Sequence, residues 1–354
     1  MSRVAITGAS GFIGGRIVEL LNAQPGHEMR LLVRRFGGLA RAVRYPVEVI
    51  RPRAWDVAGV AEVLEGCDTV LHCAHDWNDA GWNVAFAKTL VRASAQAGVD
   101  AIVALSSASV YYPSAEPTIV ERAHATSTPW EYAQVKRDVT EALLSESRAH
   151  DIPAAVLEPP CVYGPFSGFA NVPAQQLRAG RVVVPTDDEG IAHLVHVDDV
   201  THAMLAAADS RASGRFLVTG AQPVTWSWFY GAIQREIGAG EVVPMSAAAV
   251  DELLAPTAGA AVRRARTDPR VVLSSPRLAL ARNAVHRIVG DARWSKARAQ
   301  VPRLVLPEPS DRLYRWSRAM IDDGRARSEL GYAPAKDISR GMAELGEYLR
   351  WARL

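Results

Sequence analysis

Cysteine is scarce in this chain: its 354 residues include only Cys67, Cys73 and Cys161. No two of them form a Cys-x-x-Cys pair, and three residues do not build a disulfide framework, so we expect reduced thiols in a cytoplasmic protein. Long apolar runs are also lacking, and none approaches the roughly 18 residues that a membrane-spanning helix needs. The first apolar strand begins at about residue 3, which leaves no room for a signal peptide.

A large excess of one charge is absent as well, because the formal net charge is only +2. Nucleic-acid-binding proteins usually carry a strong basic excess, so the composition argues against that class. Internal repeats and low-complexity linkers are also missing. With 49% hydrophobic and 22% charged residues, the chain is long enough to bury a large core and to form two lobes. We expect its partner to be a small molecule.

Glycine is concentrated near the start, in the sequence Thr-Gly-Ala-Ser-Gly-Phe-Ile-Gly of residues 7–14. An apolar run precedes it and a helical apolar pattern follows it, which predicts a strand, a turn and a helix. Three glycines at this spacing let backbone N–H groups at a helix N-terminus approach a dinucleotide pyrophosphate. Such turns also close ordinary strand–helix units, but this one stands where a doubly wound fold places its first crossover. The turn residues expected to hold the cofactor are Gly8, Ser10, Gly11, Phe12, Ile13 and Gly14.

The second predicted strand, residues 29–33, is followed by Arg34 and Arg35. A dinucleotide fold reads the adenosine ribose at this point: an acidic residue suits the 2′-hydroxyl of NAD, whereas an arginine suits the 2′-phosphate of NADP. No acid stands here, so the sequence favours NADP(H), with NAD(H) as the alternative. The two arginines could instead be a solvated pair that ends a strand.

Aromatic residues follow the fourth predicted strand, residues 68–74. Loops at the carboxyl ends of parallel strands line the ligand crevice, so Trp77 and Trp82 are candidates for the substrate pocket. They could equally fill a gap beneath the next helix, which we place over residues 83–96. His72 stands within the apolar strand with no partner nearby in sequence, and we interpret it as a structural residue.

A fifth strand, residues 101–105, delivers Ser107 to the same edge of the sheet, and a later helix carries Tyr132 and Lys136. Tyrosine and lysine four residues apart share one helical face. An ammonium group there would favour the phenolate and lower the phenol pKa from about 10, giving a usable general acid or base. Such pairs also occur by chance on surface helices, but the preceding glycine turn and serine-bearing strand favour a catalytic set.

These motifs, in this order, resemble the extended short-chain dehydrogenase/reductases, also called the NAD-dependent epimerase/dehydratase family. The resemblance covers most of the chain. It includes the glycine turn, the strand 68–74, Asn83, the Val-Tyr-Gly-Pro stretch 162–165, the Val-His-Val-Asp-Asp segment 195–199 and the Glu-Leu-Gly-Tyr element 329–332. It implies an α/β fold with a Rossmann-type doubly wound parallel sheet and a smaller, mainly helical substrate-binding lobe.

The resemblance also implies roles for residues. Ser107, Tyr132 and Lys136 would be the catalytic triad, and Tyr163 and Gly164 would lie beside the nicotinamide. The further cofactor-site residues that it implies are Cys73, Ala74, Pro159 and Val162, together with Tyr132 and Lys136. It implies a homodimer through the helices near residues 83–96 and 130–149, although a monomer would bury the same faces. No metal is implied.

Departures from the family pattern bear on the chemistry. Members that eliminate water carry an acidic pair where this chain has Ala108 and Ser109, so we do not expect a dehydratase. Epimerases of the family hold the substrate diphosphate with an asparagine and an arginine, at positions that are Cys161 and Ala192 here. Without that arginine a charge-assisted bidentate contact is lost, which argues for another substrate or a relocated cation. Glu158 replaces an arginine usual before the proline, which the sequence does not explain.

One substrate-side element survives, because Asn171 and Val172 resemble the asparagine that opens a substrate-binding helix in the family. The substrate-binding candidates are therefore Trp77, Trp82, Ser109, Asn171 and Val172. The predicted domains are a dinucleotide-binding domain in residues 1–165, with returns to its sheet near 193–220, and a substrate-binding lobe in residues 166–354.

A basic insert, residues 245–306, interrupts the second lobe. Its segment 262–303 holds eleven Arg or Lys residues against two Asp. Three interpretations compete: a lid whose arginines grip a phosphate or carboxylate, a basic amphipathic helix on an anionic membrane surface, and a solvated helix packed on the core. A lid could replace the missing diphosphate clamp.

The reaction that we expect is hydride transfer between NADP(H) and a secondary alcohol or ketone, because NADPH is usually consumed in net reductions. The resemblance implies a sugar or sugar-like substrate. One alternative is an epimerase that oxidises and re-reduces one carbon on tightly bound NAD. Another is a dinucleotide-sensing protein without catalytic activity, against which the Ser107, Tyr132 and Lys136 set argues.

Overall fold

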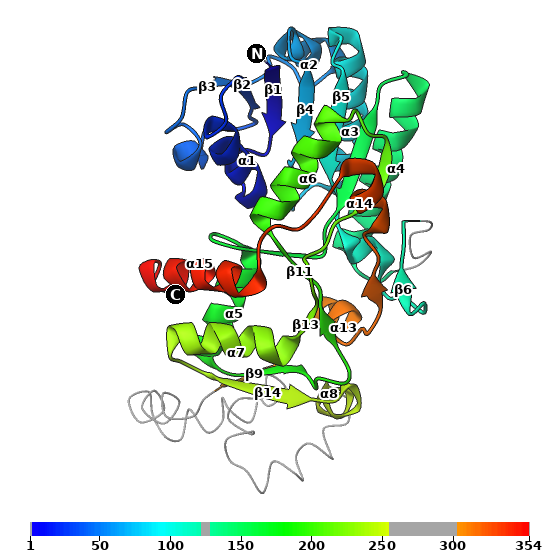
Figure 1. Ribbon diagram of the computed structural model, residues 1–354. Coiled ribbons are helices and arrows are strands. Elements are labelled where there is room, and N and C mark those ends of the chain that lie inside the picture. The colour runs from blue at the N-terminus through cyan, green and yellow to red at the C-terminus, as the bar shows by residue number, and fades with distance from the viewer. Residues whose placement is uncertain (1, 122–127, 255–302, 354) are drawn as a thin grey trace, which may run out of the picture. The chain divides into compact units, whose positions relative to one another are not determined.

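The computed structural model describes residues 2–121, 128–254 and 303–353, which form two compact units (Figure 1). Unit 1 consists of Met1–Ser167, His193–Pro223 and Ala319–Gly341, and unit 2 of Gly168–Ala192, Val224–Arg318 and Met342–Leu354. Nearly all of the basic segment 262–303, on which the three interpretations depend, lies outside the described residues. Among the described residues, no helix has the length and apolarity needed to cross a membrane.

Unit 1 is built on a seven-stranded sheet in the order β12-β7-β5-β4-β1-β2-β3, and every neighbouring pair is parallel. Its strands are β1 (Ser2–Thr7), β2 (His27–Leu32), β3 (Val47–Ile50), β4 (Thr69–His72), β5 (Ala101–Leu105), β7 (Ala154–Glu158) and β12 (Gly214–Leu217). The chain grows outward from β1 to β3 and then continues from β4 on the other side of β1. This reversal between β1 and β4 is the switch point at which doubly wound sheets bind ligands, and it confirms the predicted fold class.

Helices cover both faces of this sheet (Figure 1), and a separate hydrophobic core lies beneath each set. Ile17 of α1 and Met204 of α6 are buried in one core, while Val60 of α2 and Leu90 of α3 are buried in the other. The helices of unit 1 are α1 (Phe12–Asn22), α2 (Val57–Leu64), α3 (Ala80–Ala97), α4 (Glu131–Ala149), α6 (Val197–Asp209) and α14 (Gly324–Leu330). Two further strand pairs complete it: β8 (Cys161–Tyr163) with β11 (Leu194–His196), and β6 (Thr118–Ile119) with β16 (Met320–Ile321).

Helix α3 begins three residues before the predicted start, because Asp79 caps it by accepting from Trp82 N at 2.8 Å. A carboxylate at this position satisfies an N–H group that the first helical turn leaves unpaired. Trp82 therefore stands in the first turn of the helix, and only Trp77 remains in the preceding loop. Thr225 caps the helix Trp226–Ile237 in the same way, since its Oγ1 accepts from Trp228 N at 3.1 Å.

Unit 2 is smaller and combines helices with short strands. A three-stranded parallel sheet has the order β14-β9-β15, and β10 pairs with β13. Its strands are β9 (Gly180–Pro185), β10 (Ile191–Ala192), β13 (Val224–Thr225), β14 (Glu241–Met245) and β15 (Arg303–Val305). Its helices are α5 (Gly168–Ala179), α7 (Trp226–Ile237), α8 (Ala247–Leu254), α13 (Pro309–Arg315) and most of α15 (Ile338–Trp351). The aromatic run at the start of α7 packs inside this unit, where Trp226 and Phe229 are buried.

Candidate active site

The glycine turn between β1 and α1 has no room for side chains at two of its positions. Gly8 has a φ of +75°, and a Cβ there would lie 2.6 Å from the backbone nitrogen of Ala74. A Cβ on Gly14 would lie 2.3 Å from the Gly8 carbonyl oxygen. The turn, the end of β4 and the start of α1 are therefore in direct backbone contact. Gly11 precedes α1 in extended conformation, and no side chain caps the helix there, so its first N–H groups suit an anion.

A cavity of about 540 Å³ lies at this turn, entirely within unit 1. Its volume is within the range of small-molecule and cofactor sites. The predicted cofactor and substrate residues that line it are Gly8, Ser10, Gly11, Phe12, Ile13, Gly14, Arg34, Arg35, Cys73, Ala74, Trp77, Trp82, Tyr132 and Lys136. The glycine turn and the predicted catalytic pair thus face the same space, although they are more than a hundred residues apart in sequence.

Tyr132 and Lys136 lie one turn apart on α4. The Lys136 ammonium lies 5.9 Å from the centre of the Tyr132 ring and donates to the carbonyl of Leu105, at the end of β5, at 3.0 Å. Ser107, two residues beyond that strand, forms a side-chain hydrogen bond with Tyr132. Its Oγ also accepts from the backbone N–H of Ser109 at 3.1 Å. The three predicted catalytic side chains therefore gather where β5 ends.

The predicted effect of Lys136 on the phenol is not found. Burial raises the pKa of Tyr132 to about 12, opposed by the hydrogen bond from Ser107. Burial also lowers the pKa of Lys136 to about 8. Lys136 is buried and Tyr132 is partly buried, and desolvation disfavours the charged form of each. The Lys136 ammonium donates to the Leu105 carbonyl and not to the phenol. Tyr132 therefore keeps its proton at neutral pH.

An aromatic group surrounds Tyr132. The Trp77 ring stacks on the Tyr132 ring with 5.2 Å between centres and 15° between planes, and His75 contacts both edge-on. Trp130 lies against the same phenol ring at 5.5 Å. The Trp77 side chain is nevertheless 76% exposed, because only one side of its ring is covered. Burial lowers the pKa of His75 to about 4, so that imidazole is neutral at pH 7.

Arg34 contributes a second charged wall of the cavity. Its guanidinium lies over the Trp82 ring, 4.6 Å from the centre, and forms an ion pair with Asp76 in the loop after β4. Trp82 in turn stacks on Phe86, with 4.7 Å between ring centres. The arginine is therefore held by a carboxylate and an aromatic face, and the interpretation of a purely solvated pair does not hold for Arg34.

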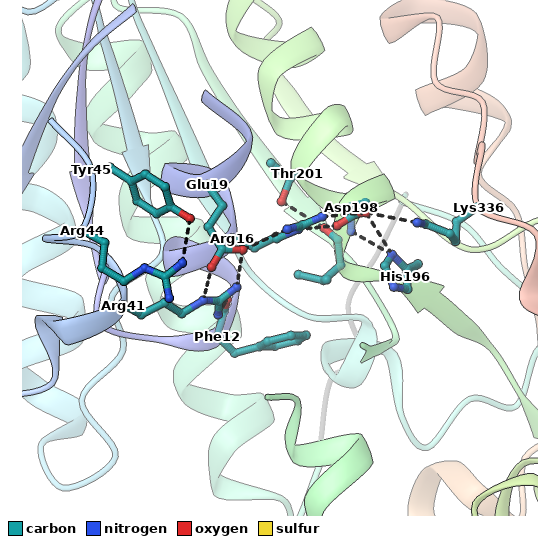
Figure 2. A network of polar contacts seen from close by, with 11 residues as sticks. Phe12, Arg16, Glu19, Arg41, Arg44, Tyr45, His196, Asp198, Thr201 and Lys336 are labelled. Carbon is teal, nitrogen blue, oxygen red and sulfur yellow. Dashed lines mark hydrogen bonds and ion pairs between the residues drawn. The ribbon is translucent and has the colours of Figure 1, made fainter. Parts of the chain in front are cut away.

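Helix α1 is braced from its outer side (Figure 2). Glu19 accepts from Arg16 at 2.9 Å and from Arg41 at 2.5 and 2.8 Å. Arg41 also donates to the Phe12 carbonyl at 3.3 Å, in the first turn of α1. Its guanidinium covers the Phe166 ring. This network holds the helix whose N-terminus borders the cavity.

Several predicted site residues lie away from the cavity lining. Ser109 is buried, and its Oγ has no hydrogen-bond partner within the described part of the chain. The Pro159 carbonyl accepts from Ala108 N at 2.9 Å, and the Val162 carbonyl accepts from Ser167 Oγ at 2.7 Å. None of these three residues lines the larger cavity, and Val162 lies within β8.

Tyr163, expected beside the nicotinamide, lines a separate cavity of about 130 Å³ with His196 and Asp199. Gly164 has a φ of +137°, and a Cβ on it would lie 3.0 Å from the Val197 side chain. The structure therefore places this pair within the packing around β8 and β11.

Asn171 and Val172 belong to α5 in unit 2. Asn171 accepts from the Tyr348 hydroxyl at 2.9 Å, while Val172 is about half exposed. Their substrate-binding role stays a prediction.

Glu158 has a structural explanation that the sequence did not provide. It is fully buried at the end of β7 and accepts from the Tyr111 hydroxyl at 2.5 Å. Burial and the neighbouring carboxylate raise the pKa of Tyr111 far above its usual range. The acid therefore serves as an internal acceptor for a phenol on the neighbouring segment.

Comparison with known proteins agrees with this geometry. The model of the NAD dependent epimerase/dehydratase family matches residues 4–219. The chain belongs to this family. A curated relative, the 3-diazoavenalumate denitrifying reductase of Streptomyces sp, is 31% identical over 295 residues, which cover 75% of this chain and 94% of the relative.

Solved structures of low sequence identity share this fold. DesIV, a dTDP-glucose 4,6-dehydratase from Streptomyces venezuelae with NAD bound, has a TM-score of 0.71 and 19% identity, covering 99% of this chain and 98% of its own. MoeE5 in complex with UDP-glucose and NAD has a TM-score of 0.65 and 20% identity, covering 100% of both chains. The family consists of NAD-dependent enzymes, as the motifs implied.

His75, Asp76 and Trp130 are among the residues of the site that sequence reasoning missed. His75 and Asp76 lie in the loop after β4, whose carboxyl end meets the glycine turn, so the rule that loops at strand ends line the crevice could have found them. Trp130 is the residue before α4, and its contact with Tyr132 has no signature in the sequence.

Proposed function

We propose that this protein is an NAD(P)H-dependent reductase that transfers hydride to the carbonyl carbon of a sugar-like substrate. The observation that carries the proposal is the cavity of about 540 Å³ that the glycine turn shares with Tyr132 and Lys136. A bound nicotinamide would supply the hydride. The glycine turn and the N-terminus of α1 would hold the pyrophosphate.

The residues of the chain would then manage the substrate oxygen. Tyr132 Oη would donate a proton to the oxygen as the carbonyl carbon gains hydride, so that a ketone becomes a secondary alcohol. Ser107, already hydrogen-bonded to Tyr132, would orient that oxygen. The Lys136 ammonium would stabilise the phenolate left on Tyr132 and bind a ribose hydroxyl.

The protonation state of the phenol suits a general acid. Desolvation raises the pKa of Tyr132 to about 12, so the phenol holds its proton at neutral pH. A reductase needs that state at the start of its reaction. The position of Arg34 and Arg35 after β2 supports NADP(H) as the preferred cofactor, because guanidinium groups suit a 2′-phosphate.

A planar aromatic substrate is the second candidate, favoured by two observations. The open face of Trp77 beside Tyr132 suits stacking against another ring. The curated relative is named as acting on a diazo compound. In the corresponding reaction, hydride would add to the ring carbon that bears a diazonium group while dinitrogen leaves with the bonding electrons. No oxygen needs a proton in that step.

Tyr132→Phe separates the two reactions. We expect ketone reduction, measured as loss of reduced-nicotinamide absorbance with a keto-sugar nucleotide, to fall by about 10²- to 10⁴-fold. Hydride transfer to an aryl diazonium salt would be almost unchanged, because its product takes no proton from the phenol. In both cases NADPH should still bind. If the wild-type protein reduces neither probe, the proposal is wrong.

Denaturing the freshly purified protein provides a second test. An epimerase of this family keeps its dinucleotide, so stoichiometric NAD in the released fraction would contradict the reductase assignment. A protein that senses dinucleotides without catalysis would bind NADPH, and its Tyr132→Phe variant would keep full biological function. We expect instead a dinucleotide that exchanges freely and a variant that loses function.

We also propose a reducing compartment such as the cytoplasm, because the chain has only three cysteines and all are free thiols. The family resemblance leads us to propose a homodimer through α3 and α4. Analytical ultracentrifugation at several protein concentrations would test this assembly.

A further inference from the structure

The ion pair between Arg34 and Asp76 lies at the point where a dinucleotide fold recognises the adenosine ribose. The Asp76 side chain is only 9% exposed and that of Arg34 is 39% exposed. Both residues line the larger cavity, as does Trp82, which covers one face of the guanidinium. The carboxylate thus lies inside the site and takes up part of the hydrogen-bonding capacity of the arginine.

Asp76 is fixed in place on all sides. Its backbone N–H donates to Asn83 Oδ1 at 2.8 Å, and its carbonyl accepts from Asn83 Nδ2 at 2.8 Å. Its Oδ1 accepts from Asn78 N at 2.9 Å, while its Oδ2 faces Arg34. The hydrogen bond from Asn78 and the charge of Arg34 hold the pKa of Asp76 below its usual range. A charged carboxylate is therefore built into this wall.

A fixed negative charge next to Arg34 has opposite effects on the two dinucleotides. The 2′-phosphate of NADP carries up to two negative charges, and on Arg34 it would be repelled by Asp76. The 2′-hydroxyl of NAD is a hydrogen-bond donor, and a carboxylate is a good acceptor for it. Arg34 alone favours NADP(H), whereas the pair reduces that preference.

We propose that Asp76 determines cofactor specificity: it competes with the 2′-phosphate for Arg34 and accepts from the 2′-hydroxyl, so that the protein uses NAD(H) as well as NADP(H). The acid acts from the loop after β4, not from the end of β2 where sequence rules look for it. Asn83 is the positioning residue of this device, because it holds the Asp76 backbone through both of its polar groups. The inference rests on the proposed dinucleotide site.

Isothermal titration of the full-length protein with NADPH and with NADH tests the proposal without relying on turnover. In Asp76→Asn the ratio of the two dissociation constants should shift toward NADPH by about tenfold, mostly through tighter NADPH binding. The Asn side chain keeps the size of Asp and can accept from Asn78, so folding should be preserved. An unchanged ratio would overturn the inference.

Two further variants make the result specific. Glu48→Gln also removes one negative charge, but Glu48 lies in β3, its partner is Arg30 and it does not line the cavity. The ratio of the two dissociation constants should therefore stay at the wild-type value. In the background of Arg34→Gln, the Asp76→Asn exchange should change the ratio much less than in wild type, because the group it competes for is gone. An equal change in both backgrounds would refute competition for Arg34.

Failure of the proposed function would give a different result from failure of the inference about Asp76. If neither dinucleotide binds to the wild-type protein, the dinucleotide site itself is wrong. If both bind and only the ratio is insensitive to Asp76, the reductase proposal stands and the role of Asp76 falls.

Discussion

Arg16 and Asp198 form a two-point ion pair, with 2.6 Å between Nε and Oδ1 and 3.1 Å between Nη2 and Oδ2 (Figure 2). Asp198 Oδ2 also lies 3.3 Å from the Lys336 ammonium. Burial would raise the pKa of Asp198, but the Arg16 hydrogen bond and the nearby cations lower it to about 2. The pair ties α1, whose N-terminus borders the cavity, to the first turn of α6.

Arg16→Gln should destabilise the protein by about 2 kcal/mol, because it leaves a largely buried carboxylate with a weaker partner. The Arg16 side chain is 30% exposed, which keeps the cost below that of a fully buried pair. Dinucleotide affinity should fall as well, since α1 loses a brace. Thermal unfolding and titration with NADPH measure the two effects.

Arg92→Gln is the matched control for this exchange. Arg92 makes an equally good two-point pair with Glu146, both distances being 2.8 Å, but its side chain is 48% exposed. Exposed pairs typically contribute under about 1 kcal/mol. Equal destabilisation by the two exchanges would show that the Arg16 pair has no special role.

Gly8→Ala should abolish dinucleotide binding and lower the unfolding temperature by several degrees. The new Cβ would lie 2.6 Å from the backbone of β4's continuation at Ala74, so the turn must open. Gly26 also has a positive φ, +97°, but nothing within 4 Å of an added Cβ. Gly26→Ala thus measures the conformational strain alone, about 1 kcal/mol, and should keep full NADPH affinity. Similar losses in both variants would exclude close approach as the cause.

Lys136→Met should make the protein more stable and inactive. The folded-state pKa of Lys136, about 8, lies below its ordinary 10.5, so at pH 7 the buried charge costs a few kcal/mol. Between pH 8 and 10.5 the unfolded wild type binds more protons than the folded one, and wild-type stability rises with pH. The advantage of the variant should therefore shrink across that window in urea unfolding. Lys88→Met, on the exposed face of α3, should show no such convergence.

His72 should make the protein acid-sensitive. It is fully buried against Thr7 Oγ1, 2.7 Å from its Nδ1, and burial lowers its pKa from 6.5 to about 3. Below pH 6.5 His72 takes up a proton in the unfolded state but not in the folded state. The free energy of unfolding therefore falls by up to about 1.4 kcal/mol for each pH unit of acidification. His72→Gln should flatten this part of the profile, whereas exposed His202→Gln should not. If neither exchange changes the dependence of stability on pH, His72 is not the cause of the acid sensitivity.

Local patterns predicted most elements of unit 1. The strand of residues 101–105 has the predicted bounds, since a short apolar run reports burial directly. The sequence places the start of α3 three residues too late, because Asp79 stands in a polar stretch typical of a loop. The site was predictable in outline, because Tyr132 and Lys136 share a helical face whatever the fold.

The protonation of the site was not predictable in the same way. Spacing alone suggests that Lys136 lowers the pKa of Tyr132, but the outcome depends on the desolvation of each group, which raises the pKa of Tyr132 and lowers that of Lys136. Likewise, the aromatic surroundings of Tyr132 come from the loop that carries Trp77, whose path depends on Asn83 and the edge of the sheet.

The sequence by itself determined the glycine turn, the order of strands and helices, and the spacing of the catalytic pair, because each depends on neighbours within a few residues. Only the tertiary structure decided that Asp76 faces Arg34, that Trp77 stacks on Tyr132, and that Arg16 meets Asp198. Those contacts join segments brought together by the sheet and its packed helices. Charge pairing and desolvation depend on distances between residues that are far apart in the sequence, so only the folded structure shows them.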